Sequence, residues 1–307
     1  MIGVVSHDAG GAEVVSSYLR RESLAYVATL EGPAAGVFER KLGAVRKRAL
    51  NETIHESAWV LCGSSWQSEL EWHALDVAKR AGKRTVVFLD HWVNYRERFE
   101  RDGRVHWPDE IWVGDEAGIE IARRVFDGLD LRVTLVPNPY FLDIQEDLRA
   151  AELRLGVRAE GGTGRVLLVT EPTSEHARLR FGNERHWGYT EFDAVRYFLT
   201  NATALGMGYE RVVLRPHPAE TTTKYAEILA AYEGRVQLSQ GRPLVEDIVE
   251  SDVVAGCTSM AMVVGLLARK RVLSCVPPGG MRCELPQAEI ERMEDLLATW
   301  FASQRSL

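Results

Sequence analysis

The feature that most constrains the fold of this chain is a regular alternation of short, β-branched apolar runs with longer amphipathic runs. Short apolar strands separated by helices are typical of a parallel sheet, because each parallel connection must cross over the sheet. The pattern therefore predicts the α/β class with doubly wound parallel sheets. The predicted strands are residues 2–6, 25–30, 59–62, 85–89, 111–113 and 133–136, then 166–170, 212–214, 236–239, 253–255 and 272–276.

The alternation pauses once, near the middle of the chain. A helical run to about residue 155 and a Gly-rich polar stretch at 160–164 interrupt it. A chain of 307 residues is long for one core and typical of two domains of about 150 residues each. We therefore predict an N-terminal domain over 1–145, a linker over 146–164 and a C-terminal domain over 165–307. The expected architecture is two Rossmann-like doubly wound domains facing a cleft.

The predicted helices complete this pattern in both halves. In the first half they are residues 12–21, 37–46, 68–81 and 117–126, and in the second half 189–205, 223–232, 244–250, 260–269 and 287–301.

Composition narrows the class of protein further. The formal net charge is −7 and no long basic block occurs, which argues against a general nucleic-acid binder. No stretch reaches about 18 apolar residues, and the first residues are expected to form a strand and not a signal peptide. The four cysteines are scattered without a C-x-x-C pair, so reduced thiols in a cytoplasmic protein are expected. Peripheral attachment to the inner face of a membrane is compatible with this composition.

A stiff segment, Arg-Pro-His-Pro at residues 215–218, follows the predicted strand 212–214. The two prolines restrict their own φ angles and keep the residues before them extended. Arg215, His217 and Pro218 are therefore predicted at the carboxyl end of a strand, where open α/β sheets bind ligands. An arginine and an imidazole there suit an anionic, ring-bearing ligand such as a nucleotide. The alternative is a turn in which His217 only caps the following helix.

The first strand leads directly into a glycine turn. Asp8 is followed by Gly10 and Gly11, which permit close approach of a ligand to the backbone at a helix N-terminus. Asp8 is a candidate general base, and the alternative is that it caps the first helix. The motif is not a complete G-x-G-x-x-G.

A dense group of polar and aromatic residues follows the strand at 85–89. Asp90, His91, Trp92, Asn94 and Tyr95 combine aromatic faces, which stack on sugars, with groups that bind hydroxyls. They are predicted to contact an acceptor sugar, with Asp90 as a second candidate base. The alternative is a packing loop in which the aromatic rings fill space and Asp90 pairs with an arginine.

Two further loops complete the candidate site. Residues 171–188 are polar and are expected to form a long functional loop, with Glu171 at its start on the nucleotide side. Thr258 and Ser259 follow a strand and a glycine and open a helix, where hydroxyls and free amides could hold a phosphate. A plain helix cap is the alternative for this pair.

Together, the His-Pro pair and the downstream Asp-Val-Val-Ala-Gly-Cys-Thr-Ser-Met resemble the donor half of a GT-B glycosyltransferase. The resemblance is to bacterial sialyltransferase, polysialyltransferase and Kdo transferase enzymes, which use CMP-activated sugars. It implies that His217 and the Thr258-Ser259 pair hold cytidine monophosphate. The family's acidic motif is matched only by Asp8-Ala9-Gly10, which lacks the middle acid, so Asp90 remains a rival base. The resemblance covers about residues 210–275 and is architectural elsewhere.

The resemblance implies a metal-independent glycosyltransferase of surface polysaccharide biosynthesis. Its substrates would be a CMP-activated nonulosonic acid or Kdo donor and a glycan or lipid-linked acceptor, with no nucleic acid and no cofactor. No D-x-D signature for a metal occurs in a suitable loop. Alternatives are a CDP-glycerol-type glycerophosphotransferase, a nucleotide-sugar 2-epimerase, and a nonenzymatic nucleotide-sugar-binding component of a polysaccharide assembly complex. The sequence does not specify the linkage or the oligomeric state.

Overall fold

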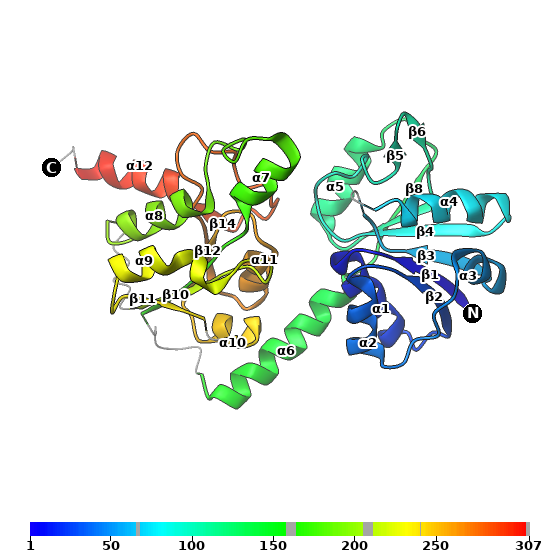
Figure 1. Cartoon of the computed structure of the whole chain (residues 1–307), viewed down its shortest axis with the longest axis horizontal. Helices are drawn as coiled ribbons and strands as arrows, with labels where there is room; N and C mark the ends of the chain where they lie inside the picture. Colours follow the sequence, from blue (N-terminus) through cyan, green and yellow to red (C-terminus); the bar gives the residue numbers. More distant parts are fainter. Residues whose placement is uncertain (66–67, 158–163, 205–210, 240, 305–307) are drawn as a thin grey trace. The chain divides into compact units, whose positions relative to one another are not determined.

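Two separate parallel sheets organise the chain. The computed structural model describes residues 1–65, 68–157, 164–204, 211–239 and 241–304. Within these residues the chain forms an N-terminal unit, Met1–Asp143, and a C-terminal unit, Ile144–Leu307, each with its own six-stranded sheet (Figure 1). The α/β class with two Rossmann-like doubly wound domains is thereby confirmed.

The division between the units falls inside one helix, α6 (Pro139–Leu155). The predicted linker, 146–164, thus includes the second part of this helix, and its Gly-rich residues 160–163 lie outside the described residues. The predicted domain boundaries remain a prediction.

The N-terminal sheet has the order β2-β1-β3-β4-β7-β8 and is parallel throughout. Its central strands are buried on both faces, which explains their nearly continuous apolar sequences. The strands are β1 (Ile2–Ser6), β2 (Tyr26–Leu30), β3 (Trp59–Cys62), β4 (Arg84–Leu89), β7 (Glu110–Val113) and β8 (Arg132–Leu135).

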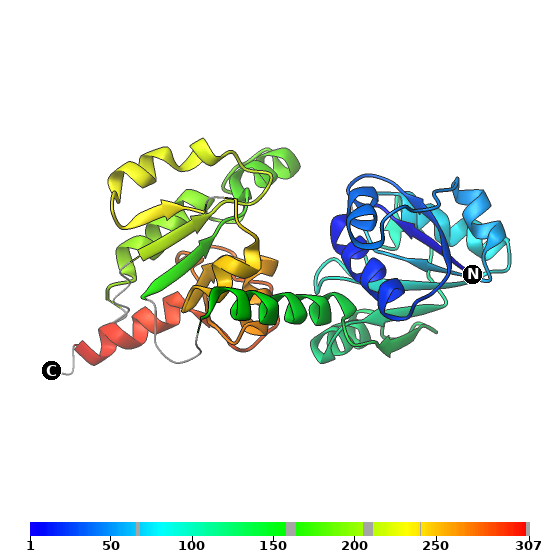
Figure 2. The same cartoon turned by 90° about the horizontal axis from the view of Figure 1, so that it is seen from below.

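Helices cover both faces of this sheet. α1 (Ala9–Arg21) and α2 (Ala34–Leu42) contribute to the hydrophobic cluster on one face. α3 (Leu50–Glu56), α4 (Leu70–Arg80) and α5 (Glu116–Val125) pack in the cluster on the other face (Figure 2). A short hairpin of β5 (Glu100–Arg101) and β6 (Arg104–Val105), which we did not predict, lies outside the sheet.

The C-terminal sheet has the order β11-β10-β9-β12-β13-β14 and is also parallel. One face packs against α8 (Glu191–Asn201), η1 (Thr222–Tyr225), α9 (Ala226–Ala231) and α12 (Met293–Gln304). α11 (Met260–Leu267) lies on the other face, where Gly265 meets Val254 and Val272, and it contacts α10 (Leu244–Val249). The strands are β9 (Arg165–Val169), β10 (Arg211–Arg215), β11 (Val236–Leu238), β12 (Val253–Gly256), β13 (Arg271–Ser274) and β14 (Ile290–Arg292).

Two predicted elements of this unit were wrong in type. The expected long loop at 171–188 contains a helix, α7 (Thr173–Phe181). Its residues are mostly polar, so the sequence lacks the apolar periodicity that predicts a helix. In the structure Ala177 is buried, and Gly182 ends the helix at a φ of 69°. The expected helix at 287–301 begins instead with β14, because edge pairing with β13 overrides local preference there.

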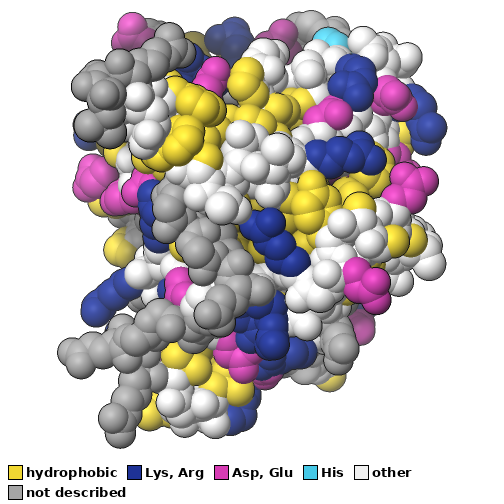
Figure 3. Space-filling model, turned by 90° about the vertical axis from the view of Figure 1, so that its left-hand side faces the viewer, with side chains coloured by type: hydrophobic (Ala, Val, Ile, Leu, Met, Phe, Trp, Pro, Cys, Tyr) yellow, Lys and Arg dark blue, Asp and Glu magenta, His cyan; other side chains and the backbone are white. Residues whose placement is uncertain are grey.

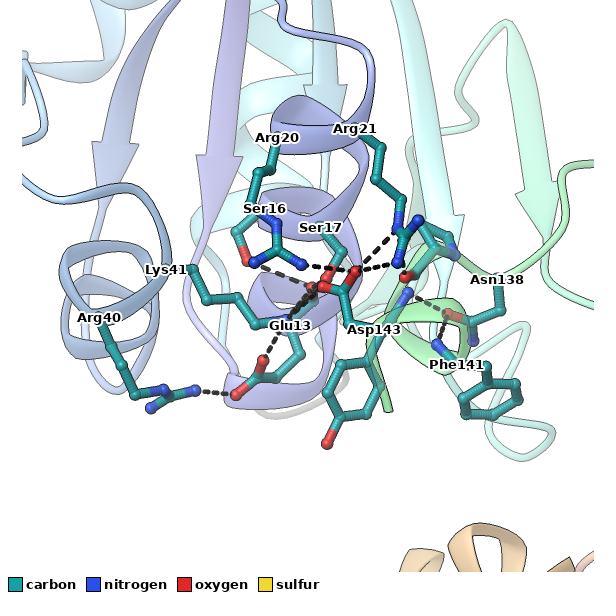
Figure 4. A network of polar contacts seen from close by, with 12 residues as sticks. Glu13, Ser16, Ser17, Arg20, Arg21, Arg40, Lys41, Asn138, Phe141 and Asp143 are labelled. Atoms are coloured by element: carbon teal, nitrogen blue, oxygen red, sulfur yellow. Dashed lines mark hydrogen bonds and ion pairs between the residues drawn. The ribbon is translucent and has the colours of Figure 1, made fainter. Parts of the chain in front are cut away.

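A buried ionic cluster anchors the start of α6 within the N-terminal unit. The carboxylate of Asp143 accepts contacts from Arg20 at 2.7 Å, from Arg21 at 2.6 Å and from Lys41 at 3.3 Å (Figure 4). Burial alone would raise the pKa of Asp143, but the hydrogen bonds from Ser17, Arg20 and Arg21 and the charge of Lys41 hold the pKa below its ordinary value. The cluster joins α1, α2 and α6.

We predict that Asp143→Ala lowers the free energy of unfolding of the N-terminal unit by about 2–3 kcal/mol, because three cations lose a buried counter-charge. Denaturant unfolding followed by the tryptophan fluorescence of that unit would measure the change. Glu39→Ala is the matched control, since Glu39 pairs with Lys47 at the surface and its removal should cost less than about 1 kcal/mol. Equal losses in the two variants would contradict the anchoring role.

Candidate functional site

Three neighbouring strands carry the candidate site of the C-terminal unit. β9 lies between β10 and β12, and all three are parallel. Their carboxyl ends therefore share one edge of the sheet, where Glu171, the His217 segment and the Thr258-Ser259 pair follow them. The predicted donor-side residues thus follow adjacent strands.

The start of α11 already carries a carboxylate. The Glu171 Oε2 atom accepts a hydrogen bond from the backbone amide of Thr258 at 3.1 Å. Ser259 is the N-cap of α11, and its hydroxyl accepts from the amide of Ala261 at 3.3 Å. A negatively charged group is thus accommodated at this helix end, although here it belongs to the protein.

The ionisation of Glu171 is strongly perturbed. Burial raises its pKa to about 7; the Thr258 amide lowers the pKa, and the nearby charge of Glu220 raises it. The carboxyl group therefore changes charge near neutral pH, which is a common property of functional sites.

His217 is exposed and its tautomer is determined by local hydrogen bonds. Its Nδ1 atom accepts from the amide of Ala219 at 3.1 Å, so the neutral ring carries its proton on Nε2. Burial lowers the pKa of His217; Glu220 raises the pKa and His176 lowers it further. The neutral ring is therefore favoured, and it offers one N–H donor to a ligand.

Glu220, which we did not predict, holds the His217 segment in place. Its carboxylate accepts from the His217 amide at 2.9 Å, from Thr170 Oγ1 at 2.7 Å and from Lys224 Nζ at 2.7 Å. Burial raises the pKa of Glu220, but the hydrogen bonds, first that from Lys224, outweigh this effect and lower the pKa overall. A sequence signal existed, because Glu220 lies only three residues after His217 in a segment that we singled out.

Arg215 and Pro218 differ in their surroundings. An Nη atom of Arg215 donates to Asp247 Oδ2 at 2.7 Å and to the carbonyl oxygen of Arg242 at 2.7 Å. These bonds tie the end of β10 to the start of α10, which is a structural role. Pro218 is exposed in the loop. Contact of either residue with a nucleotide remains a prediction.

In the N-terminal unit, Asp8 and the two glycines follow β1 as expected. Asp8 occupies the N-cap position of α1, but its side chain makes no capping hydrogen bond; its Oδ1 atom lies 2.7 Å from Nδ1 of His7. A Cβ atom on Gly11 would lie 2.8 Å from the amide nitrogen of Ser64, and one on Gly10 would collide with Asp90. The glycines therefore allow neighbouring loops of the same unit to approach α1; contact with a ligand remains a prediction.

Asp90 is paired with a buried arginine. Its Oδ1 atom accepts from Arg98 at 2.9 Å and from the Ser64 hydroxyl at 2.8 Å. The Arg98 side chain is only 5% exposed. This pairing is the structural alternative considered for Asp90.

The four predicted acceptor residues fall into two groups. Trp92 and Tyr95 are buried: the Trp92 indole N–H donates to Asp115 at 3.0 Å, and the Tyr95 ring stacks on Phe126. The faces of these two aromatic rings pack within the unit, so the predicted stacking on an acceptor sugar lacks support. His91 and Asn94 are partly exposed, and Asn94 has a left-handed backbone with a φ of 55°. Burial lowers the pKa of His91; Asp90 raises the pKa and Arg98 lowers it.

A buried glutamate of this unit escaped the sequence analysis. Glu71 in the first turn of α4 is 4% exposed, and its Oε1 atom accepts from the His7 amide at 2.7 Å. Within the described residues its Oε2 atom is buried without a hydrogen-bond partner. Burial raises the pKa of Glu71 to about 7; the His7 amide lowers the pKa, and Asp8 raises it. Its spacing from Leu75 and Ala78 places it on the buried face of α4, which is the signal that we missed.

Three general properties bear on ligands. Among the residues that the structure describes, no group of three His, Cys, Asp or Glu side chains could hold a metal ion. No helix in the described ranges is both long and apolar enough to cross a membrane. On the face drawn in Figure 3, cationic and anionic side chains are interspersed with hydrophobic ones.

Comparisons with known proteins agree on the fold. No protein-family model matches the chain, and no curated protein matches it in sequence. Among solved structures, UDP-GlcNAc 2-epimerase from Methanocaldococcus jannaschii has a TM-score of 0.61 at 8% identity, covering 98% of this chain and 91% of its own. A putative UDP-N-acetylglucosamine 2-epimerase from Listeria monocytogenes has a TM-score of 0.57 at 11% identity, covering 88% and 78%. UDP-N-acetylglucosamine 2-epimerase from Rickettsia bellii has a TM-score of 0.56 at 9% identity, covering 92% and 80%.

These similarities are too low in identity to transfer an activity, and they show the fold alone. The neighbours are GT-B-type proteins, and the chain has a GT-B-like fold of two Rossmann-like units.

We predict that Glu171→Gln changes the pH dependence of stability. Because the pKa is raised from 4.5 to about 7, the folded chain holds a proton that the unfolded chain releases. This contribution to stability is complete below about pH 4.5 and is lost as the pH rises through about 7, a change of up to about 3 kcal/mol. The side chain of the Glu171→Gln variant does not ionise, so the stability of the variant should not show this loss as the pH rises. Unfolding at pH 4.5 and pH 8 would measure the difference, with Glu227→Gln on the exposed side of α9 as control; parallel pH profiles for all three proteins would contradict the prediction.

Proposed function

We propose that the protein is a glycosyltransferase that takes its sugar from a nucleotide donor, most consistently a CMP-activated nonulosonic acid or Kdo. The supporting observation is the convergence of His217 and the start of α11 at the carboxyl ends of adjacent parallel strands. The Glu171 carboxylate on the Thr258 amide supports an anion site there. The GT-B-like fold is compatible with this activity.

In the proposed reaction the donor phosphate contacts Thr258, Ser259 and the first amides of α11. The acceptor hydroxyl loses its proton to Asp8, or to Asp90, while its oxygen bonds to the anomeric carbon. The bond from that carbon to the phosphate oxygen breaks, and the electron pair leaves on the nucleotide. The Nε2–H group of His217 stabilises the leaving phosphate by a hydrogen bond, which requires no metal.

The second candidate is a nucleotide-sugar 2-epimerase, since the three solved structures above carry that name and share the fold. An epimerase would convert its nucleotide sugar without an acceptor. Product analysis with and without a glycan acceptor separates the two activities. Binding of a nucleotide sugar without turnover under either condition would instead favour a nonenzymatic binding protein.

We predict that His217→Ala lowers the affinity for CMP at least tenfold. A hydrogen bond to a charged group contributes about 1.5–3 kcal/mol, and about 1.4 kcal/mol corresponds to tenfold. Because His217 is exposed, the melting temperature should stay unchanged. His217→Gln, which keeps a side-chain N–H donor, should lose less, and His55→Ala in the N-terminal unit is the control. Unchanged calorimetric affinity in His217→Ala would exclude the imidazole from the site.

We also predict that replacing Thr258 and Ser259 together by alanine reduces CMP affinity at least tenfold, because two hydroxyl donors to the phosphate are removed. The melting temperature should fall slightly, since Ser259 caps α11. Calorimetry and thermal unfolding of the same sample distinguish the two effects. A lower melting temperature with unchanged affinity would mean that the pair is only a cap, and tighter binding of UDP than of CMP would contradict the donor class.

A further inference from the structure

A pocket beside the His217 segment is not used by the proposed phosphate site. It has a volume of about 330 Å³ and lies wholly within the C-terminal unit. Its lining includes Ser174, Glu175 and Arg178 of α7, Glu184, Thr221 and Lys224. A volume of this size is at the lower end of the range for small-molecule sites and suits one sugar residue.

The floor of the pocket pairs two carboxyl groups with one lysine. Lys224 is ion-paired with both Glu191 and Glu220, whose side chains are almost fully buried. The amide and the hydroxyl of Ser174 both donate to Glu191 at 2.8 Å. Lys224 is therefore fully engaged, and the floor keeps one carboxyl charge that it does not neutralise.

The rim carries the groups that are available to a ligand. Arg178, Glu175 and Glu184 are exposed, and in the described part of the chain their side chains have no hydrogen bond or ion pair. One guanidinium and two carboxylates therefore face a pocket of mixed charge. The Thr221 hydroxyl adds a further donor and acceptor.

This set of groups selects a class of ligand. A guanidinium pairs with a carboxylate through two parallel hydrogen bonds, and carboxylates accept hydrogen bonds from sugar hydroxyls. Glu175 and Glu184 repel any anion, but they repel a phosphate with its higher charge more strongly than a single carboxylate. An uncharged sugar would form no ion pair with Arg178. A polyhydroxylated sugar that bears one carboxylate satisfies all of these groups.

The pocket adjoins the His217 segment. Ala219 and Glu220 line it, and they follow His217 by two and three residues. His176 of α7 lies between Glu175 and Arg178 in sequence and is close enough to His217 to affect its ionisation. A ligand whose phosphate meets His217 can therefore extend into the pocket.

We propose that this pocket binds the sugar of the nucleotide donor, and that Arg178 selects a carboxylate-bearing sugar by pairing with its carboxylate. The assignment to the donor rests on the proposed function above, whereas the carboxylated-sugar pocket is defined by its own residues.

The test is calorimetric titration of the full chain with CMP and with CMP-N-acetylneuraminic acid. Arg178→Ala should lower the affinity for CMP-N-acetylneuraminic acid at least tenfold and change that for CMP less than twofold. Arg178→Lys should recover part of the loss, because it restores the charge without the planar fork. Arg196→Ala, which removes an exposed arginine of α8 that does not line the pocket, is the control and should change neither affinity.

The inference is overturned if Arg178→Ala leaves the affinity for the carboxylated donor unchanged, or lowers both affinities equally. It is also overturned if UDP-N-acetylglucosamine, whose sugar is uncharged, depends on Arg178 to the same degree.

Free N-acetylneuraminic acid and free Kdo, titrated at millimolar concentration, separate failure of the pocket from failure of the proposed function. If Arg178-dependent binding of a free sugar persists while no nucleotide binds, the proposed function fails and the sugar pocket stands. If CMP binds through His217 but no carboxylated ligand depends on Arg178, the pocket assignment fails and the proposed function stands. Binding of inorganic phosphate at Arg178 in place of either sugar would contradict the ligand class.

Discussion

The parallel pairing of strands is the constraint on which both candidate sites depend. Each strand of a parallel sheet returns through a helix on one of the two faces, so every carboxyl end lies on the same edge. β9 is hydrogen-bonded between β10 and β12, and this pairing gathers Glu171, His217 and Thr258 from segments more than forty residues apart. In the N-terminal unit, the pairing of β3 with β1 and β4 likewise brings the loops of Asp8 and Asp90 against each other.

At these edges the pKa of a carboxyl group depends on its burial and on whether a cation lies beside it. Glu71 is buried and Glu171 is partly buried. Each accepts a hydrogen bond from a backbone amide, and burial raises the pKa of each to about 7. Glu220 is also buried, but Lys224 stands beside it and the pKa falls below its ordinary value. The two glutamates without a cation are thus the groups that can change charge near neutral pH, whereas Glu220 stays ionised as a support for His217.

Much of the fold could be predicted because the local periodicity of apolar residues indicates the strands and helices. The predicted strands at residues 2–6 and 59–62 agree with β1 and β3, since both are apolar runs buried on two faces. Two predictions of element type failed for different reasons. The sequence of α7 has no apolar periodicity, and β14 is defined by its pairing with β13. The position of His217 at a strand end was foreseeable from its prolines, but its support by Glu220 and the pairing of Asp90 with Arg98 require the folded chain.

The hydrogen bond from Thr258 to Glu171 has a consequence for any anion bound at the start of α11. A phosphate that reaches the Thr258 amide must displace the Glu171 carboxylate or meet it in its neutral form, because two anions cannot share one N–H donor at low cost. Since the pKa of Glu171 is about 7, protonation at neutral pH requires little free energy, and the neutral carboxyl could itself donate a hydrogen bond to the phosphate. Glu171 therefore satisfies the Thr258 amide and can give it up to an anion at little cost.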